Sequence, residues 1–525
     1  MTLAGVRLAT PAHRAGRRRP PRLLVLLSVA VAVALLLPLA FLLLEASQAG
    51  WHDVYRLLFR RLSETLLLNT VELAAGVSAA CAVVGTGVAW LVERTNLPGA
   101  ALWGSLLVLP LAIPDFVVGY AWNSVSPAVH GFGGALLVMT MGLYPLVYLP
   151  VAAALRRADP AEEEVARSLG AGPLTTFLRV TLRQVRPALS GGCLLVCLAL
   201  LAEYGAFEIV RFQTFTTTIF SDLQLGFDPA GASGLSLVLV GLAMVALAGE
   251  AAVSTRGRLS GSGREPGLRR RRGLTPGARA AALAAVTAVA GAGVGMPLGT
   301  LAYWMVASHT TTVHPGSVWS ALASSATYSA AAALVATAAA LPVALLSVRF
   351  RSPGAVLLER STFVVEALPG LVVALALVFF AERFAQRLYQ TSPLLVAAYA
   401  LMFFPLALVS LRASVAQAPP ELEEVARSLG ARSWQATARV TLPLVAPGLA
   451  AAFSLVFLSA VTELTATLLL VPPGVHTLAT EFWAQETNTS YGAAAPYAVV
   501  MVAVAAVPSL ILSTWFDRGS RRVAR

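Results

Sequence analysis

Two glutamates at matching positions lie within the apolar parts of this sequence. Glu203 and Glu463 stand 260 residues apart, each deep in or near the end of an apolar run. A charged side chain at the bilayer centre costs roughly 2.5–3.5 kcal/mol on insertion scales, so it normally faces a cavity or a partner. Carboxylate oxygens suit hard cations, so the pair, with Tyr204 and Glu208 nearby, could line a path for such an ion. Alternatively, each acid could cap a helix and never meet a solute.

Other polar side chains that could bind a ligand or react give weaker predictions of a functional site. Asp115 and Glu366 lie near prolines, where they could satisfy backbone groups that a kink sets free. A cysteine in an apolar run is usually a small hydrophobe, and two histidines in one external loop are weak grounds for a metal site. The residues concerned are Cys193, Cys197, His309 and His314. No nucleophile–base arrangement stands out, which argues against an enzyme, and any metal site stays unknown.

The elements that must position these acids are membrane spans. Of the 525 residues, 57% are hydrophobic and 12% are charged, against roughly 25% charged in soluble domains. Twelve apolar runs are each near the ~20 residues that cross ~30 Å of hydrocarbon, which predicts an all-α polytopic membrane protein with about twelve spans. The runs are Leu23–Leu44, Leu66–Val92, Leu102–Trp122, Ala135–Leu155, Ala188–Ala206, Leu235–Ala252, Ala280–Val306, Leu322–Val348, Thr362–Phe380, Leu394–Leu411, Leu449–Val471 and Ala495–Leu512.

Arginine accounts for every cationic side chain in the net charge of +12, because the sequence contains no lysine. The arginines cluster beside the ends of apolar runs, as the positive-inside rule asks of cytoplasmic segments. With twelve spans, this distribution predicts that the N- and C-termini are both cytoplasmic. Topology explains the basic balance better than nucleic-acid binding does, so we expect no nucleic-acid partner.

One polar segment occurs twice in this apolar chain. Glu163–Leu182 and Glu423–Leu442 are identical at thirteen of twenty positions, beginning with EEVARSLGA. The chain therefore reads as two homologous six-span halves, residues 1–254 and 280–525. Residues 255–279 between them, rich in Gly, Ser and Arg, are expected to form a flexible basic cytoplasmic linker. Six spans per half make the repeat parallel, with a pseudo-twofold axis along the membrane normal and a pathway between the halves.

The repeated segment begins with a short helix. Asp159 can cap it, Pro160 suits its first position, Glu162 can complete a capping box, and Gly170 fits just past its end. So short a helix must be docked to persist, and it could be a structural elbow. Because polar positions are retained in both copies, we instead expect a surface that a dimeric partner recognises. Its apolar face is Val165, Ala166 and Leu169; its polar face is Glu163, Glu164 and Arg167.

The pattern Glu-x-Ala, with Gly six residues after the Glu and a later Val-Thr-Leu, resembles the EAA loop of binding-protein-dependent ABC importer permeases. Two positions depart from the family pattern: Arg183 stands where proline is usual, and Thr437 where an aromatic such as Phe177 is common. These departures predict unequal partner contacts by the two halves. The pattern is carried by Glu164, Ala166, Gly170 and Leu182, and again by Glu424, Ala426, Gly430, Leu442 and Pro443.

The resemblance implies a type I ABC importer permease fold in a bacterial plasma membrane, with lipid around it. It implies two copies of a cytoplasmic ATPase, which use ATP and Mg, and an extracytoplasmic substrate-binding protein. This chain would bind no cofactor; it lacks the lysine that a P-loop requires. The coupling residues implied are Glu163, Glu164, Ala166, Arg167, Leu169 and Gly170, with Glu423, Glu424, Ala426, Arg427, Leu429 and Gly430 in the second copy.

Two segments bear on the substrate. Leu201–Phe220 and Val461–Trp483 resemble ferric-iron permeases, which are commonly fused chains with two EAA loops. The resemblance implies ferric-iron import by alternating access, with Glu203, Tyr204, Glu208 and Glu463 at the path or gate. Permeases for thiamine, phosphonate, sulfate or polyamine share the coupling motif and stay open as alternatives. An ion-driven secondary transporter would also fit two parallel halves, although it needs no repeated coupling element.

Overall fold

The computed structural model describes residues 20–49, 60–224, 229–257, 273–307, 315–350 and 368–506, and these are folded mainly into helices. Eight of the described helices are long and apolar enough to cross a membrane, and two sharply bent helix pairs would bring the number of spans to ten. The prediction of an all-α polytopic protein is confirmed. Glu366, His309, His314 and most of the expected linker lie outside the described residues.

The remaining two of the twelve predicted spans extend beyond the described residues. Their described parts are the helices Gly370–Phe384 and Tyr491–Ala506. The run Leu102–Trp122 is no straight span, because its two helical parts meet at an angle of 94°. The break falls at Ile113 and Pro114, where proline cannot continue the preceding helix.

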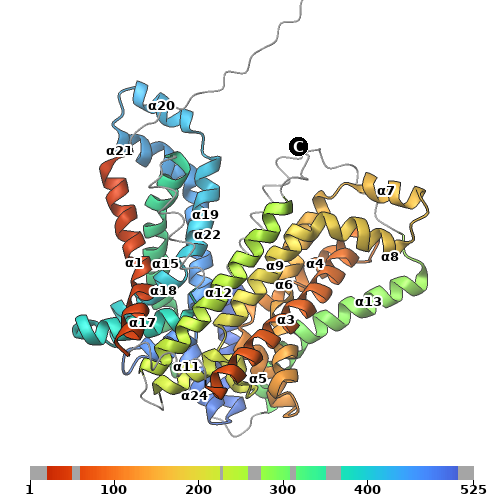
Figure 1. The fold of residues 1–525 in the computed structure, drawn as a ribbon, viewed down its shortest axis with the longest axis horizontal. Helices are drawn as coiled ribbons and strands as arrows, with labels where there is room; N and C mark the ends of the chain where they lie inside the picture. Colours follow the sequence, from red (N-terminus) through yellow and green to blue (C-terminus); the bar gives the residue numbers. More distant parts are fainter. Residues whose placement is uncertain are drawn as a thin grey trace, which may run out of the picture.

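The two halves have corresponding elements in the same order (Figure 1). In the first half they are α1 (Arg22–Ala49), α3 (Arg61–Arg94), α4 (Ala100–Leu106), η1 (Leu109–Ala112), α5 (Asp115–Val125), α6 (Gly131–Arg157), α7 (Pro160–Ser168), α8 (Pro173–Thr176), η2 (Phe177–Thr181), α9 (Leu182–Ala202), α10 (Gly205–Ile209), α11 (Phe215–Gln224) and α12 (Pro229–Gly257).

The second half begins with a broken first span and repeats this plan. Its elements are α13 (Pro276–Ala290), η4 (Gly291–Gly295), α14 (Met296–Ala307), α15 (Pro315–Arg349), α17 (Gly370–Phe384), η5 (Gln386–Leu388), α18 (Ser392–Met402), α19 (Phe404–Gln417), α20 (Pro420–Ser428), α21 (Ser433–Ala436), η6 (Thr437–Thr441), α22 (Leu442–Val461), α23 (Thr465–Leu470) and α24 (Leu478–Thr487).

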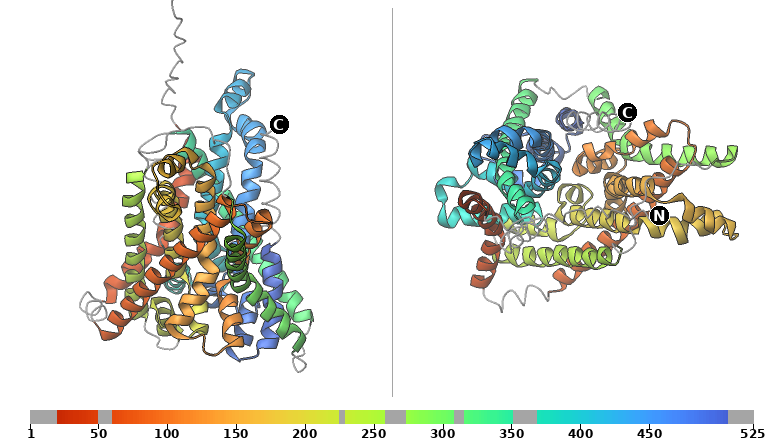
Figure 2. Two further views of the ribbon diagram at one scale, coloured as in Figure 1. Left: turned by 90° about the vertical axis from the view of Figure 1, so that its right-hand side faces the viewer. Right: turned by 90° about the horizontal axis from the view of Figure 1, so that it is seen from above.

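Each half has a three-helix core, and the first span of each half packs against the other half. In the first half α3, α6 and α9 pack together; in the second α15, α19 and α22 do so. Helix α1 packs against α15 and α17, whereas α14 packs against α5. Both EAA-loop helices, α7 and α20, lie at the same end of the molecule (Figure 1), and the two halves stand side by side when seen from above (Figure 2). The exchange of first spans therefore joins the halves.

A close approach of α3 to α6 depends on a glycine. A Cβ at Gly85 would lie 2.9 Å from the carbonyl oxygen of Tyr144 and 2.9 Å from the Cβ of Val147. Both are parts of α6 that cannot rotate away, so a side chain at this position must push the helices apart. Gly87, on the same helix, has nothing within 4 Å of an added Cβ.

We predict that Gly85→Val destabilises the protein and that Gly87→Val does not. Overpacking of this kind costs about 1–3 kcal/mol, and Val at both positions brings the same helix propensity. Thermal unfolding of the detergent-purified protein would show a lower Tm for Gly85→Val alone. Equal Tm values for the two variants would contradict the close α3–α6 packing.

Candidate functional site

Helices α7 and α20 have the same form and the same well-defined end. In α7 the Asp159 carboxylate accepts a hydrogen bond from the Ala161 amide at 2.9 Å, as the sequence predicts. The expected capping box is wrong in its second part, because the Glu162 carboxylate accepts from the Gln184 side chain at 2.6 Å instead. In α20 the capping position holds Pro419, which makes no side-chain cap.

Glycine ends both helices in the left-handed conformation. Gly170 has φ +84° and Gly430 has φ +91°. The Gly170 amide donates to the Arg167 carbonyl at 2.9 Å and the Ala171 amide to the Ala166 carbonyl at 3.0 Å. The second copy repeats both bonds, so each helix ends in a Schellman motif. The prediction that Gly170 and Gly430 stand just past the helix ends is confirmed.

The apolar face of each short helix points outward. Leu169 and Leu429 are each 82% exposed, and Val165 and Val425 are more than half exposed. The first acid of each motif points inward instead: Glu163 is only 8% exposed. Grouping Glu163 with the outward polar residues was therefore wrong, because Arg94 and Thr181 hold its carboxylate inside the first half. Glu164 and Glu424 remain exposed.

The two intramembrane glutamates occupy equivalent places at the ends of equivalent helices. Glu203 follows the last residue of α9, and its Oε1 accepts from the Ala206 amide of α10 at 2.7 Å. Glu463 follows α22, and its Oε1 accepts from the Ala466 amide of α23 at 3.0 Å. Each acid thus caps a short helix. Both side chains are only half-buried, because they also line a cavity.

This axial cavity has a volume of about 360 Å³ and is lined by matching parts of both halves. Glu203, Glu463 and Asp115 contribute carboxylates to its wall. Leu143 and Phe403, which stand 260 residues apart, line it from the two sides. The cavity therefore lies where a pathway on the pseudo-twofold axis is expected. Within the described residues no group of three or more His, Cys, Asp or Glu side chains is arranged as a metal site.

The cavity is asymmetric because a pair of packed residues, one large and one small, has its order reversed between the two halves. The counterpart of Asp115 in the second half is Gly370, each following the matching proline of an Ile-Pro or Leu-Pro pair. A Cβ at Gly142 would collide with the Asp115 carboxylate, and a Cβ at Gly370 would collide with the Met402 side chain. Gly142 and Met402 are themselves counterparts. The second half thus fills with a thioether the space that an acid fills in the first.

Aromatic rings from the two halves pack together around α5 and α24, which lie toward the end of the molecule opposite α7 and α20 (Figure 1). The Phe482 ring lies 5.3 Å from those of Phe116 and Tyr120, and the Tyr204 ring lies 5.6 Å from that of Trp483. We call these five residues the aromatic layer. Tyr204 therefore belongs to this contact between the halves. Glu208, on the neighbouring α10, is exposed.

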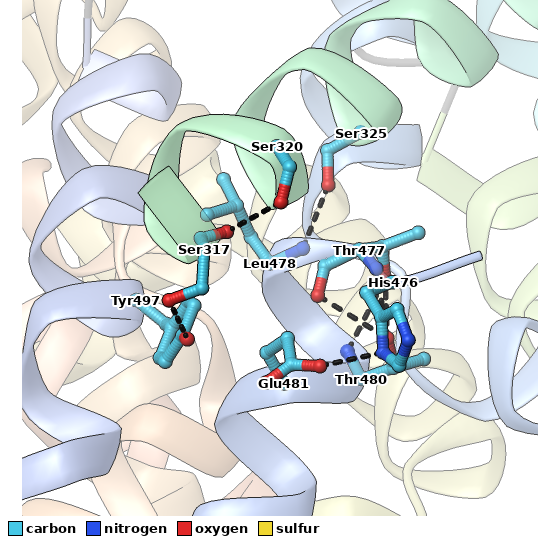
Figure 3. A network of polar contacts seen from close by, with 9 residues as sticks. All are labelled: Ser317, Ser320, Ser325, His476, Thr477, Leu478, Thr480, Glu481 and Tyr497. Atoms are coloured by element: carbon cyan, nitrogen blue, oxygen red, sulfur yellow. Dashed lines mark hydrogen bonds and ion pairs between the residues drawn. The ribbon is translucent and has the colours of Figure 1, made fainter. Parts of the chain in front are cut away.

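Polar contacts position α24, the helix that carries Phe482 and Trp483 of the aromatic layer, beside α15 (Figure 3). The Leu478 amide donates to the Ser325 hydroxyl at 2.8 Å. Thr477 and Thr480 form a capping box at the start of α24. His476 Nδ1 lies 2.6 Å from Glu481 Oε1 and ties the preceding loop to the same helix. These bonds fix the direction in which Phe482 and Trp483 project.

Comparison with known proteins agrees with this arrangement. Residues 82–256 and 336–525 match the family described as binding-protein-dependent transport system inner membrane component. The chain belongs to this family. It is thus a multi-pass inner-membrane permease of a binding-protein-dependent transport system, and the two matched segments correspond to its two halves.

Three relatives differ in how much of this permease they match. The Fe(3+)-transport system permease protein FbpB 2 of Haemophilus influenzae is 36% identical over 504 residues, 95% of this chain and 99% of that protein. The sulfate transport system permease protein CysT of Salmonella typhimurium is 29% identical over 238 residues, 41% of this chain and 86% of that protein. The molybdenum transport system permease protein ModB of Escherichia coli (strain K12) is 31% identical over 184 residues, 30% of this chain and 79% of that protein.

Sequence reasoning missed three contributions to these sites. Asp115 was assigned to a proline kink, although it also lines the cavity. Arg94 and its counterpart Arg349 were assigned no contact with the EAA loops, although each lies beside the first acid of a repeated EEVARSLGA segment. Aligning the two halves at Pro98 and Pro353, where the offset is 255 rather than 260, brings these arginines into register. The pairing was therefore detectable once the change of offset was followed.

We predict that Gly170→Ala impairs coupled transport, and that Gly170→Ala/Gly430→Ala impairs it further. An added Cβ meets nothing within 4 Å at either position, so the cost comes only from the left-handed backbone, roughly 1–2 kcal/mol per residue. Transport into proteoliposomes would fall while membrane insertion stays intact. Gly172→Ala is the matched control, since its Cβ also meets nothing and its φ is not left-handed. If the double variant transports as well as the parent protein, the role of Gly170 and Gly430 in coupling is refuted.

Proposed function

We propose that this permease imports ferric iron by alternating access, driven by two copies of a cytoplasmic ABC ATPase and supplied by an extracytoplasmic binding protein. The observation that carries the substrate is similarity over nearly the whole chain to a permease named for Fe(3+) transport. The relatives named for sulfate and molybdenum match less than half of this chain. ATP and Mg would be bound by the ATPase, and this chain would bind no cofactor.

The charge of the axial cavity supports a cationic substrate. Among the residues that the structure describes, three carboxylates and no basic side chain line it. Like charges in a low-dielectric site repel strongly, which disfavours sulfate and phosphonate anions. A hard trivalent cation prefers oxygen ligands of this kind. Thiamine and polyamines are also cations, so the solute must be determined by experiment.

The organisation of the chain fits this function. We propose that residues 1–254 and 280–525 are the two permease halves, that 255–279 link them in the cytoplasm, and that both termini are cytoplasmic. The exposed side chains of Val165, Leu169, Val425 and Leu429 would enter the ATPase grooves. The coupling set would comprise Glu163, Glu164, Ala166, Arg167, Leu169 and Gly170 with Glu423, Glu424, Ala426, Arg427, Leu429 and Gly430.

We further propose that the aromatic layer is the outer gate and that Glu203, Glu463 and Asp115 face the ion behind it. Tyr204 would contribute to the gate, and Glu208, exposed on the adjacent α10, to the entrance. Contact between rings of opposite halves keeps the two sides of the pathway together. Rocking of the halves would separate these rings and admit the ion from the binding protein.

The substrate prediction is that ferric iron stimulates ATP hydrolysis by the assembled transporter. The permease, its ATPase and its binding protein would be reconstituted together, and ATPase rates compared with ferric iron, sulfate, thiamine or a polyamine as the only added solute. We expect stimulation by ferric iron alone. Stimulation by thiamine but not by ferric iron would overturn the substrate and leave the permease assignment standing.

The path prediction is that Glu203→Gln and Glu463→Gln each lower ferric-iron uptake by roughly tenfold or more. Loss of one charged ligand corresponds to about 1.5–3 kcal/mol. Glutamine keeps the carbonyl oxygen that accepts from Ala206 or Ala466, so a purely capping role survives the change. Uptake of labelled iron into proteoliposomes is the measurement, with the exposed acid Glu64→Gln as control. Parental uptake by both variants would leave the acids as caps only.

A further inference from the structure

Glu163 and Glu423, the first acids of the two EEVARSLGA segments, each contact an arginine at the end of a membrane span in the same half. Arg94 is the last residue of α3, and its Nη2 lies 3.2 Å from Oε1 of Glu163. The Thr181 hydroxyl donates to the same oxygen at 2.9 Å. Arg94 and Glu163 have side chains only 12% and 11% exposed. We call Arg94, Glu163 and Thr181 the first latch.

The second half builds the same arrangement from equivalent residues. Arg349, the last residue of α15, has its Nη2 3.6 Å from Oε1 of Glu423. The Thr441 hydroxyl donates to that oxygen at 2.5 Å. Arg349 also donates to the carbonyl of Ala418, just before α20, at 2.9 Å. Arg349, Glu423 and Thr441 form the second latch.

Both threonines end an irregular helical turn. Thr181 is the last residue of the π-helix η2, and Thr441 is the last residue of the π-helix η6. Single π-turns are rare and frequently mark functional positions. Here each one places a buried hydroxyl against a carboxylate, which is buried at Glu163 and partly buried at Glu423. An extra residue in the turn at the same place in both halves is a shared feature of the two latches.

Each latch is connected to the axial cavity by one helix. Helix α9 starts directly after Thr181 and ends directly before Glu203. Helix α22 starts directly after Thr441 and ends at Val461, two residues before Glu463. At 1.5 Å per residue, such a helix spans roughly 30 Å. One continuous helix can therefore transmit a displacement from a latch to a cavity acid.

We propose that the two latches are positioning devices that make each coupling helix move together with the spans on either side of it. The inference rests on the proposed function, since it assumes an ATPase that displaces α7 and α20. Removing one partner of a buried ion pair leaves an uncompensated charge, so the pair resists separation. The coupling helix then carries the end of α3 or α15, and the start of α9 or α22, along with it.

The latches are unequal. Glu163 binds a second arginine, since Arg167 Nη2 lies 3.2 Å from its Oε2. The corresponding Arg427 donates instead to the backbone carbonyl of Glu423, at 3.1 Å. Glu163 thus has two arginine partners, whereas Glu423 has one at a longer distance. The first latch should therefore matter more for coupling than the second.

The test compares Glu163→Gln with Glu423→Gln in the reconstituted full transporter. We expect both variants to assemble with the ATPase. The amount of ferric iron transported per ATP should fall by roughly two- to thirtyfold, more for Glu163→Gln. The exchange variant Arg94→Glu/Glu163→Arg restores the opposite charges in reversed order, and it should recover part of the loss. A merely structural role predicts loss of assembly and no such recovery of the ratio.

A matched control and a second readout complete the design. Glu162→Gln makes the same change on the neighbouring residue of α7, whose carboxylate contacts the Gln184 side chain rather than α3. It should leave the transport ratio unchanged. Hydrogen exchange at the last turn of α3, measured with and without ATP and vanadate, needs no transported solute. The exchange rate should change in the parent protein when ATP and vanadate trap the ATPase, and it should not change in Glu163→Gln.

The outcomes separate this proposal from the substrate. If ferric iron stimulates nothing, the substrate proposal fails, while the hydrogen-exchange comparison still tests the latch. Parental transport ratios in both glutamine variants, or no trapping-dependent change at α3 in the parent, would overturn the latch. If Glu163→Gln does not assemble, Thr181→Val removes one hydrogen bond and keeps both charges. A lowered ratio in that variant would support the latch, and a parental ratio would overturn it.

Discussion

The cost of holding a carboxylate away from water governs the positions of the four matched glutamates in this permease. An ion without a partner loses several kcal/mol on burial, and pairing must offset that loss. At the end of the molecule that carries α7 and α20, Glu163 and Glu423 meet this need with arginines from the ends of α3 and α15. At the ends of α9 and α22, Glu203 and Glu463 accept backbone amides and face a cavity. The same constraint thus produces two kinds of site, one closed and one open.

Sequence periodicity located the repeated elements but not their orientation. The helix ends at Gly170 and Gly430 were predictable because only the left-handed conformation completes the Schellman motif there. The inward position of Glu163 was not, because an amphipathic helix is expected to turn its apolar face inward. That expectation fails for a helix whose apolar face is kept for a partner outside the chain. The π-turns ending at Thr181 and Thr441 have no pattern in the sequence that distinguishes them from ordinary helix.

For the membrane spans, too, some features could be predicted from the sequence and others could not. Their number and apolar character follow from composition, because each run is long enough to cross the hydrocarbon. Pro114 marks the position of the break within Leu102–Trp122, but the 94° angle also depends on how α5 packs against α10 and α14, which no local pattern encodes. The role of Asp115 follows from that bend, since the turn at Pro114 directs α5 along the cavity wall. Long-range packing therefore decided which of the acids in the sequence belong to the same site.

The two halves share a backbone plan but differ in the cavity and beside the short helices α7 and α20. In the cavity, the Asp115 and Gly142 pair is exchanged for Gly370 and Met402. Beside the coupling helices, the hydrogen-bonded Glu162 and Gln184 are replaced by the exposed leucines Leu422 and Leu444. A fused chain permits such divergence, because each half is made once per molecule and need not match itself across a dimer axis. Of the described acids, an ion in the cavity would then meet two from the first half and one from the second. The half with the weaker latch has the more apolar surface beside its short helix α20. Asymmetry at both ends of α9 and α22 means that equal closure of the two ATPase copies we propose need not displace the two halves equally.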